Sequence, residues 1–295
     1  MNVGLIDVDS HNFPNLALMK LSAWHKAQGD QVSFSESEPD RIYGSIVFKK
    51  NKHMLSGIQA FYPDAEIVFG GSGYDLKGQL PPEVEATCPD YSLYPDMDYS
   101  LGFTTRGCIR RCYFCVVPQK EGRLVRWHHP EQWVRHKKAM LLDNNWMADK
   151  EWFMETSQWF IDNDISLMEN GLDIRVLDRE RAEQLASIKW AAPIHFAFDD
   201  EKDEKSVLDG LKLLKEVGIN PRSKVLVYVY CHDDDHYESA VARCRQLKEA
   251  GTSAFVMFNC ESKSTQRIKH LQRWANRPWA FWSFDIADYD RRVKA

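Results

Sequence analysis

The sequence lacks any apolar run long enough to cross a membrane. None of its 295 residues lies in a stretch that approaches the roughly 18 consecutive apolar residues of a membrane-spanning helix. The first residues, MNVGLIDVDSHNFPN, also lack a basic segment followed by a long apolar run, so we expect no secretory signal. We therefore expect a protein without a membrane partner.

Cysteines are few, and their number is odd. Seven cysteines, three of them crowded together, suit a disulfide framework poorly and indicate a reducing compartment. We therefore expect a cytoplasmic protein. The net charge of −5 argues against a general nucleic-acid coat but permits a local basic groove.

The first 76 residues alternate strand-like and helix-like segments. Strands are predicted at Val3–Val8, Gln31–Phe34, Ile42–Phe48 and Glu66–Gly70, and helices at Phe13–Gly29 and Lys52–Phe61. This alternation indicates a parallel sheet covered on both faces, so we predict a small doubly wound, Rossmann-type α/β domain over residues 1–76. Residues 77–100 hold four prolines and no periodicity, which predicts a linker.

After the linker the alternation resumes with a regular spacing. Six strands are predicted at Leu101–Thr105, Ala139–Asp143, Ile165–Met168, Ile194–Phe198, Lys224–Tyr230 and Ala254–Phe258. Helices are predicted after them at Pro130–Lys138, Asp149–Asp162, Asp178–Lys189, Glu204–Val217, Asp235–Ala250 and Thr265–Asn276. Six strand–helix units are too few to close an eight-stranded barrel, so we predict a partial (β/α)6 barrel over residues 101–262 and a helical extension over 263–295.

Three cysteines follow the first of these strands. Cys108, Cys112 and Cys115 form a CxxxCxxC pattern on one compact loop. Three thiolates can bind three irons of a 4Fe-4S cluster and leave the fourth iron without a protein ligand. That iron could chelate the amine and carboxylate of S-adenosylmethionine, whose reductive cleavage would release a 5′-deoxyadenosyl radical.

The triplet, together with Phe114 before its last cysteine and its place after the first strand of a six-unit run, resembles the radical S-adenosylmethionine (radical SAM) superfamily. The surrounding TTRGC…C..C.VP…EG is similar to methylthiotransferases and cobalamin-type members. The resemblance covers about residues 100–260. It implies bound SAM and an electron donor such as flavodoxin or ferredoxin. The backbone of Phe114 would approach the adenine.

Two other interpretations of the three cysteines stay open at this point. A zinc site could combine the same thiolates with His128 or His129. The cysteines could also be ordinary core thiols. Zinc knots are usually small independent modules, whereas this triplet lies at the ligand-binding rim of a predicted barrel, and we prefer the iron–sulfur cluster.

Polar residues end the predicted strands, where a barrel presents its site. Asp143, Asn144 and Asn145 end the second strand, and the resemblance implies that they bind the methionine amine. Arg175, after the third strand, would take the carboxylate because a guanidinium pairs well with it. Asp173 or Asp199 would accept from the ribose hydroxyls. The superfamily's usual GGE-like amine motif is absent, and LLDNN occupies its place.

Basic and aromatic residues suggest further partners. Arg106, Arg110 and Arg111, followed by Lys120, Arg123 and Arg126, form a basic rim beside the cysteines, which solvated surface charge also explains. The segment RIKHLQRWANRPWAFWSF interleaves cations with Trp274, Trp279 and Trp282. Such interleaving could stack the bases of a nucleic-acid substrate, although aromatics at helical spacing more often close a core.

The remaining cysteines show no tight spacing, so we expect no second cluster. Cys231 and Cys260 end neighbouring strands and are candidate catalytic residues, as hydrogen-atom donors or covalent nucleophiles. Buried structural thiols are the alternative interpretation.

The loop after the first strand partly matches a cobalamin-binding pattern. Cobalamin domains carry an Asp-x-His-x-x-Gly loop, and here Asp9 and His11 are present, but Pro14 replaces the glycine. Gly70 and Gly71 also resemble that fold's glycine pair. Because a member of the motif is missing, we expect cobalamin to be possible but unlikely.

Together these features predict a radical SAM enzyme that cleaves SAM reductively and starts radical chemistry on an unidentified substrate, with methyl or methylthio transfer as one version. The competing class is a non-catalytic iron–sulfur or zinc protein that uses the barrel as a docking surface.

Overall fold

The computed structural model describes residues 1–10, 13–258 and 265–290, and all structural statements below concern these residues. The strands of the N-terminal part are β1 (Asn2–Asp7), β2 (Gln31–Ser33), β3 (Arg41–Ser45) and β4 (Glu66–Gly70). Its helices are α1 (Leu16–Ala27), α2 (Leu55–Phe61) and α3 (Pro82–Glu85). The four strands pair in parallel in the order β2-β1-β3-β4.

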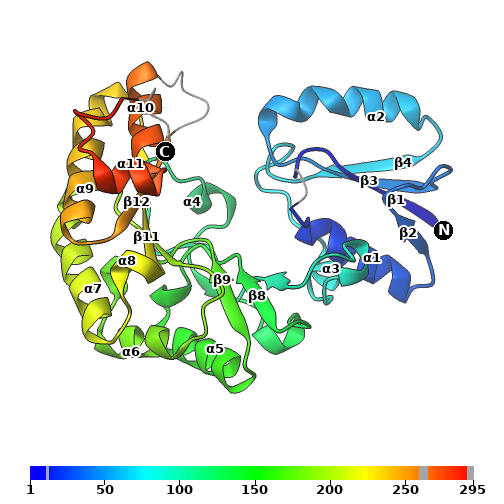
Figure 1. The fold of residues 1–295 in the computed structure, drawn as a ribbon. Helices are drawn as coiled ribbons and strands as arrows, with labels where there is room; N and C mark the ends of the chain where they lie inside the picture. The colour runs from blue at the N-terminus through cyan, green and yellow to red at the C-terminus, as the bar shows by residue number, and fades with distance from the viewer. Residues whose placement is uncertain (11–12, 259–264, 291–295) are drawn as a thin grey trace.

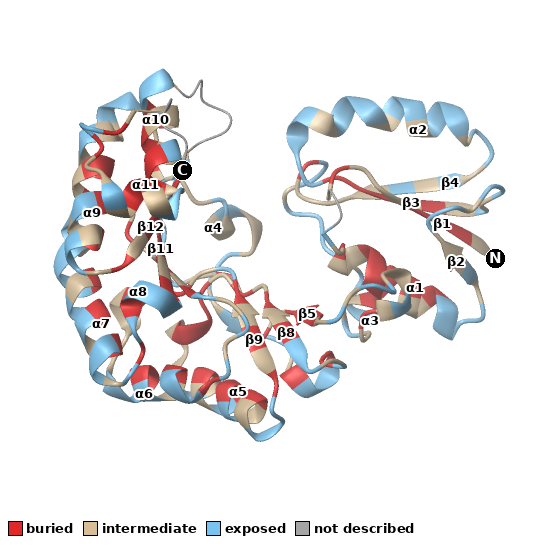
Figure 2. Ribbon diagram, viewed as in Figure 1, coloured by how far each residue is buried: buried red, intermediate tan, exposed pale blue. Residues whose placement is uncertain are grey.

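Helices cover this sheet on opposite sides, with α1 and α3 below it and α2 above it in the view of Figure 1. The tightly packed side is the one with α1, where the core consists of Val3, Leu5, Leu18, Leu21 and Val84. No residue of α2 is buried, and Figure 2 shows that helix mostly in the colour of exposed residues. In the N-terminal part, the α1 side of the sheet is therefore tightly packed, whereas α2 contributes no buried residue on the other side.

The predicted linker packs onto the N-terminal part. Val84 of α3 belongs to the α1 core, and the Asp90 carboxylate accepts hydrogen bonds from Ser22 Oγ at 2.6 Å and Lys26 Nζ at 2.7 Å. A 3-10 turn follows at Tyr91–Leu93. The absence of periodicity in this segment reflects short turns rather than an unpacked chain.

The C-terminal part contains two parallel three-stranded sheets and a short antiparallel hairpin. One sheet has the order β5-β8-β9, from β5 (Ser100–Gly102), β8 (Lys138–Leu141) and β9 (Ser166–Glu169). The other has the order β10-β11-β12, from β10 (Ile194–Ala197), β11 (Val225–Cys231) and β12 (Ser253–Phe258). The hairpin pairs β6 (Thr105–Arg106) with β7 (Val125–Arg126).

Most helices of this part lie along the outside of these sheets, whereas α4 lies on the side that faces the N-terminal part (Figure 1). The helices of this part are α4 (Val117–Lys120), α5 (Lys150–Asp162), α6 (Arg179–Ser187), α7 (Glu204–Glu216), α8 (Pro221–Lys224), α9 (Tyr237–Glu249), α10 (Gln266–Ala275) and α11 (Pro278–Ser283). The predicted α/β class with parallel sheets is confirmed. Asp149 and Asp178 cap α5 and α6, each accepting from a backbone N–H in the first turn.

One predicted helix is wrong. Over Pro130–Lys138 the chain makes only a 3-10 turn, Pro130–Gln132, before strand β8 begins at Lys138. Trp133 and Val134 are buried in the core, and the Trp133 ring lies against Gly102 of β5. The apolar residues Trp133 and Val134 therefore fix an irregular connection to the core, and their spacing does not indicate a helix.

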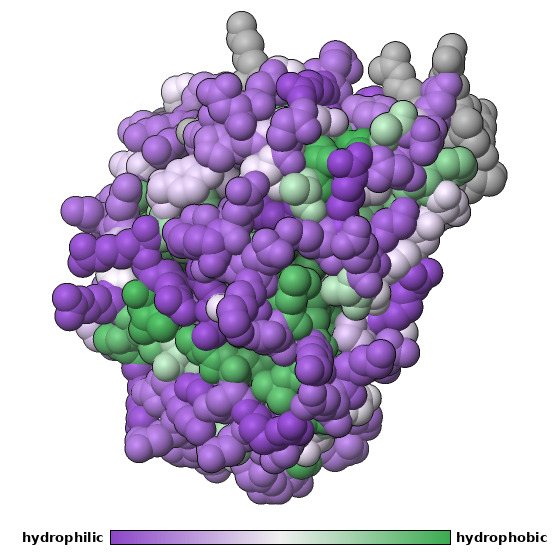
Figure 3. Space-filling model, turned by 90° about the vertical axis from the view of Figure 1, so that its left-hand side faces the viewer, coloured by the Kyte–Doolittle hydropathy of each residue, from purple (hydrophilic) through white to green (hydrophobic). Residues whose placement is uncertain are grey.

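Strands β10, β11 and β12 have one covered face and one open face. Alternate residues such as Phe196, Val227 and Val256 are fully buried beneath the helices, whereas Tyr228 and Phe255 on the opposite face are half-buried. The face of the molecule that looks away from the N-terminal part is mainly hydrophilic, with hydrophobic surface in a band across it and in a smaller area above the band (Figure 3). No helix among the described residues is both long and apolar enough to span a bilayer.

Candidate functional site

The hairpin of β6 and β7 carries the three cysteines between its arms. The backbone N–H of Cys108 donates to the carbonyl oxygen of Gly122 at 3.3 Å, which draws the two ends of the loop together. Gly107 has a φ of +75°, and a Cβ at this position would lie 2.2 Å from the carbonyl oxygen of Arg123. Only glycine fits there, so the cysteine segment begins and ends at fixed points.

Glu121 braces the same loop through its side chain. Its carboxylate, 7% exposed, accepts two bonds from the Arg106 guanidinium at 3.1 and 3.0 Å and one from the Gly107 N–H at 2.9 Å. Asn144 Nδ2 donates to it at 2.8 Å. The sequence indicates Glu121 only as part of the Glu-Gly pair in the family pattern. That its carboxylate braces the cysteine loop is seen only in the structure.

Cys108, Cys112 and Cys115 are free, half-buried thiols on this loop. Burial raises the pKa of Cys112 and of Cys115, and the nearby Arg175 guanidinium opposes the shift at Cys112. As the side chains stand, no group of three or more His, Cys, Asp or Glu residues in the described chain is positioned to hold a metal ion. The donor set nevertheless fits a cluster, because three thiols within eight residues share one loop.

Asn145 lies directly beside the first cysteine. Its Nδ2 is 3.5 Å from Cys108 Sγ and 3.3 Å from Asp173 Oδ2. Arg110 donates from its backbone N to the same sulfur at 3.3 Å and from Nε to the same carboxylate at 2.8 Å. The Oδ1 atom of Asn145 is buried without a hydrogen-bond partner. A buried acceptor of this kind fits a ligand that donates an N–H.

Asp143 has a different environment from the two asparagines that follow it. Its carboxylate is buried and accepts hydrogen bonds from the backbone N and the hydroxyl of both Thr104 and Thr105, at 2.5 to 2.9 Å. Burial raises the pKa of Asp143 to about 6 despite these four bonds. Because all four bonds come from Thr104 and from Thr105, the first residue of β6, Asp143 fixes the start of β6.

Asp173 and Arg175 form an ion pair close to the cysteines. Arg175 Nε donates to Asp173 Oδ1 at 2.6 Å, and its Nη1 donates to Asp203 Oδ2 at 2.9 Å. Asp199 lies at the end of β10, where its Oδ1 accepts from the backbone N of Tyr230 at 2.9 Å. Burial raises the pKa of Asp199 to about 6. The structure thus places Asp173 and Arg175 beside the cysteine loop.

An aromatic cluster joins the cysteine loop to the end of β11. The Phe114 ring stacks on Tyr230 with centroids 4.3 Å apart. Tyr113 stacks on His236 at 6.0 Å and meets His232 edge-on at 5.6 Å. Phe114, which was expected near the adenine, therefore lies on the open face of β11.

Of the two candidate catalytic cysteines, Cys231 lies among the described residues. Cys231 is fully buried in the hydrophobic core together with Cys244, and burial raises the pKa of Cys231 to about 11. Its thiol lies on the helix-covered side of β11, away from the open face. Cys260 lies outside the described residues.

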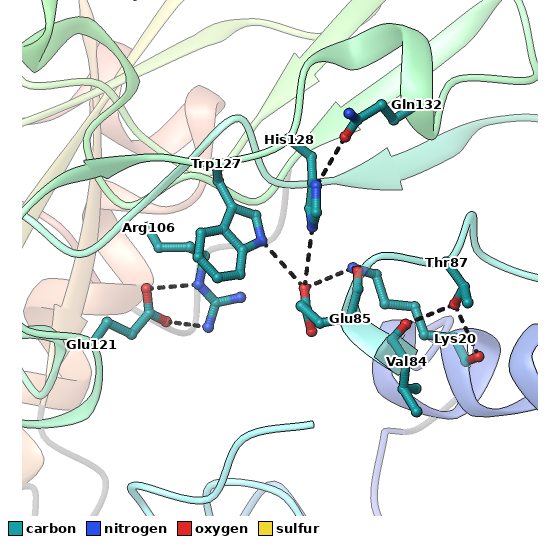
Figure 4. A network of polar contacts seen from close by, with 9 residues as sticks. All are labelled: Lys20, Val84, Glu85, Thr87, Arg106, Glu121, Trp127, His128 and Gln132. Carbon is teal, nitrogen blue, oxygen red and sulfur yellow. Dashed lines mark hydrogen bonds and ion pairs between the residues drawn. The ribbon is translucent and has the colours of Figure 1, made fainter. Parts of the chain in front are cut away.

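A polar network connects the N-terminal part to the base of the cysteine hairpin (Figure 4). Lys20 of α1 donates from Nζ to the carbonyl oxygen and to the carboxylate of Glu85, both at 2.6 Å. Trp127, just after β7, donates from Nε1 to the same carboxylate at 3.2 Å. His128 Nδ1 bonds Gln132 Oε1 at 2.9 Å. These residues line a small cavity between the two parts.

The histidines of the zinc alternative take part in other contacts. His128 lies in this network, 3.9 Å from Glu85, and burial lowers its pKa. The His129 ring packs edge-on against Trp152 and Trp159. Among the described residues neither histidine contacts a cysteine, which gives the zinc alternative no geometric support.

Asp9, in the loop after β1, binds the turn that follows β3. The Asp9 carboxylate accepts from the backbone N of Val47 at 2.8 Å and of Phe48 at 2.9 Å, and from Asn51 Nδ2 at 3.0 Å. It therefore fixes the turn that follows β3. His11 lies outside the described residues.

The glycines after β4 have a packing role. Gly71 has a φ of +94°, and a Cβ there would lie 2.2 Å from the carbonyl oxygen of Ile46. This close approach requires glycine, whether or not a ligand binds beside it.

The C-terminal tryptophans close a core. Trp274 is fully buried, and Trp279 and Trp282 pack against the same core. Arg267 lies over the Tyr237 ring, with its guanidinium carbon 3.9 Å from the ring centroid. The interleaved pattern that suggested nucleic-acid stacking thus has a structural explanation, and a nucleic-acid substrate gains no support.

One solved structure of a known protein resembles the fold described above. No family model matches the sequence, and no curated protein matches it. A solved structure that resembles it is that of the radical S-adenosylmethionine methyltransferase TsrM from Kitasatospora setae with cobalamin and a 4Fe-4S cluster bound. The TM-score is 0.62 at 13% identity, over 87% of this chain and 74% of TsrM. The expected resemblance to radical SAM proteins is confirmed at the level of the fold, and the neighbour does not support the expectation that cobalamin is unlikely.

Proposed function

We propose that this protein is a radical SAM enzyme whose cluster is held by Cys108, Cys112 and Cys115. The observation that carries the proposal is the braced loop, which presents three half-buried thiols next to Asn145, whose buried Oδ1 lacks a partner. The neighbour in structure is an enzyme, which does not favour the non-catalytic alternative. The six parallel strands of the C-terminal part would form a partial barrel around the site.

The cluster, once bound, supplies an electron and an open iron for the reductive cleavage of SAM. Asn145 would accept from the methionine amine through Oδ1, beside Cys108. The Arg175 guanidinium, which is permanently ionised and pairs with Asp173, would attract the methionine carboxylate. Asp199 would accept from the ribose.

Glu121 and Gly107 hold the loop in place without touching the reactants. By fixing both ends of the cysteine segment, they lower the entropy that the loop loses when three thiols converge on one cluster. The Phe114–Tyr230 stack packs the cysteine loop against the open face of β11.

The N-terminal part would hold a corrinoid and thereby direct the chemistry to methyl transfer. The carboxyl ends of β1, β3 and β4 point toward the part that carries α4 (Figure 1). At this edge Phe13, Val47 and Phe48 are exposed, with 74%, 42% and 43% of their surface accessible. Exposed apolar side chains at such an edge mark a binding surface for a large ligand.

The cluster is tested by anaerobic reconstitution. We expect about four irons and four sulfides per chain and formation of 5′-deoxyadenosine from SAM with a chemical reductant. Replacing any of the three cysteines with serine should reduce iron to below about one per chain and abolish deoxyadenosine. Cys88→Ser is the matched control, because Cys88 is also half-buried but lies before the hairpin. Zinc in place of iron and sulfide would overturn the proposal.

A further inference from the structure

A buried carboxylate lies at the join between the two three-stranded sheets of the C-terminal part. It belongs to Glu169, the last residue of β9, whose side chain is only 2% exposed. The carboxylate accepts hydrogen bonds from the backbone N of His195 at 2.6 Å and from the backbone N of Gly171. Around this join the described strands meet through isolated bridges instead of a continuous ladder. Glu169 therefore satisfies backbone donors at a place where the sheet is interrupted.

The same carboxylate also orients the imidazole of His195. Glu169 Oε1 lies 3.0 Å from His195 Nδ1. Because a carboxylate accepts and does not donate, the hydrogen of the neutral ring lies on Nδ1, and Nε2 is a bare acceptor. In the part of the chain that the structure describes, Nε2 has no hydrogen-bond partner and is not enclosed. His195 therefore offers a free acceptor on a ring whose orientation is fixed.

This imidazole lies on the same face of β11 as the cysteine loop. The His195 ring is parallel to that of Tyr228 within 5°, with centroids 5.2 Å apart, and Tyr228 meets Phe255 edge-on. Tyr230, two residues further along β11, stacks on Phe114 of the cysteine loop. Residues two apart in a strand point to the same side. A row of rings therefore leads from the cysteine loop to His195.

The open face around His195 has no carboxylate, ammonium or guanidinium group at the strand positions of β10, β11 and β12. These positions hold His195, Ala197, Leu226, Tyr228, Tyr230, Ser253, Phe255 and Met257. All eight are half-buried or exposed. Rings and apolar side chains around a single imidazole suit a ligand that is planar and uncharged, with one polar group that meets the imidazole.

We propose that His195 is a catalytic base for the substrate and that Glu169 is its positioning residue. The substrate class is a planar apolar ring that carries an O–H or N–H group. In the step, the O–H or N–H bond breaks, its electron pair stays on the oxygen or nitrogen, and Nε2 takes the proton. The imidazolium that forms keeps its partner, because the Glu169 carboxylate already accepts from Nδ1.

The proposal rests on the proposed function, because it concerns the substrate of that enzyme. An oxygen or nitrogen that has lost its proton is a stronger nucleophile, which suits the transfer of a methyl group to it. The base would meet the substrate on the side of β11 that also carries the Phe114–Tyr230 stack.

Visible absorbance of 4-nitrophenol measures the proton transfer on the full-length protein. This probe has one planar ring and one O–H group, and its anion is yellow. At a pH at which the free probe is neutral, we expect the protein to convert bound probe to the anion. His195→Phe keeps a flat ring beside Tyr228 but lacks the nitrogen, so the anion signal should fall at least about fivefold, the loss expected for one hydrogen bond. 4-Nitrotoluene, which lacks the O–H group, should bind both proteins equally.

His53→Phe is the matched control for the loss of an imidazole. His53 also donates from Nδ1, to the Lys50 carbonyl oxygen at 2.8 Å, but its side chain is exposed. This variant should leave the anion signal unchanged. Equal losses in the two histidine variants, or no anion signal with the unmodified protein, would overturn the assignment of His195 as a base.

NMR of the protein with isotope-labelled histidine tests the role of Glu169. The unmodified protein should show the hydrogen of the neutral His195 ring on Nδ1. In Glu169→Gln part of it should move to Nε2, because one amide oxygen replaces two carboxylate oxygens that serve three N–H groups. A hydrogen on Nε2 in the unmodified protein would contradict the positioning role.

The same spectra separate a substrate from the cofactor as the occupant of this face. A His195 signal that responds to S-adenosylhomocysteine and not to 4-nitrophenol would assign the face to the cofactor and overturn the proposal. None of these measurements uses the cluster. Absence of deoxyadenosine after reconstitution would therefore contradict the proposed function through a separate result.

Discussion

At the scale of single residues, the site depends on polar groups buried in low dielectric surroundings. Asp143 is the clearest case, because four hydrogen bonds do not offset the burial that raises its pKa to about 6. Its bonds hold Thr104 and Thr105, at the start of the cysteine hairpin. Asp143, which the sequence predicts as a cofactor-binding residue, therefore also holds the start of the cysteine hairpin.

This burial predicts a pH dependence of stability. The folded pKa of Asp143 lies above its usual value of 3.8, so the folded state binds the proton more tightly than the unfolded state. The contribution is therefore fully favourable below about pH 4 and is lost as the pH rises through about 6. Between pH 5 and pH 7 the free energy of unfolding should fall by about 1 kcal/mol from this group.

Denaturant unfolding of the metal-free protein at several pH values measures the effect. Asp143→Asn should remove about half of the slope between pH 5 and pH 7, because Asp199 has its pKa raised to about 6 as well. An unchanged slope in the asparagine variant would show that Asp143 ionises normally.

At the scale of elements, one carboxylate joins three segments. Glu85 of α3 binds Lys20 of α1 and Trp127 after β7, so it ties a helix of the N-terminal part to the hairpin that carries the cysteines. The Lys20 side chain is only 6% exposed, and burial lowers its pKa. A buried ammonium of this kind depends on its partner.

Glu85→Gln should therefore destabilise the protein by about 2 kcal/mol, because the amide keeps the shape but leaves the Lys20 charge without its counterion. The double variant Glu85→Gln with Lys20→Met should recover part of this loss, since no buried charge then remains unpaired. Thermal unfolding of the single and double variants measures both effects. A double variant less stable than Glu85→Gln would show that the pair acts through packing rather than charge.

At the scale of the whole molecule, the sheet edge of the N-terminal part faces the part with the cysteine loop (Figure 1). A corrinoid held there would lie between the two parts.

We expect hydroxocobalamin to bind this edge. Its affinity should fall at least about tenfold in Val47→Asp, because a carboxylate on an apolar contact must be desolvated. Val68→Asp is the matched control, because Val68 is equally exposed, at 42%, but lies in the middle of β4. Equilibrium dialysis with absorbance detection measures the affinity of each variant for hydroxocobalamin. Equal affinities in the two variants would contradict this placement of the corrinoid.

The sequence by itself determined the features that depend on near neighbours in the chain. The three cysteines lie within eight residues, the strand–helix alternation has a short period, and the caps Asp149 and Asp178 act within one helical turn. Each of these follows from local chemistry and spacing.

The tertiary structure decided what depends on contacts between distant segments. It turned Asp143 toward Thr104 and Thr105 and brought Asn145 to Cys108 and Asp173. It also replaced the predicted helix at 130–138 with a turn, because Trp133 is fixed by its contact with Gly102. Which polar side chain meets which partner depends on how strands and helices pack, and periodicity in one segment carries no information about its distant neighbours.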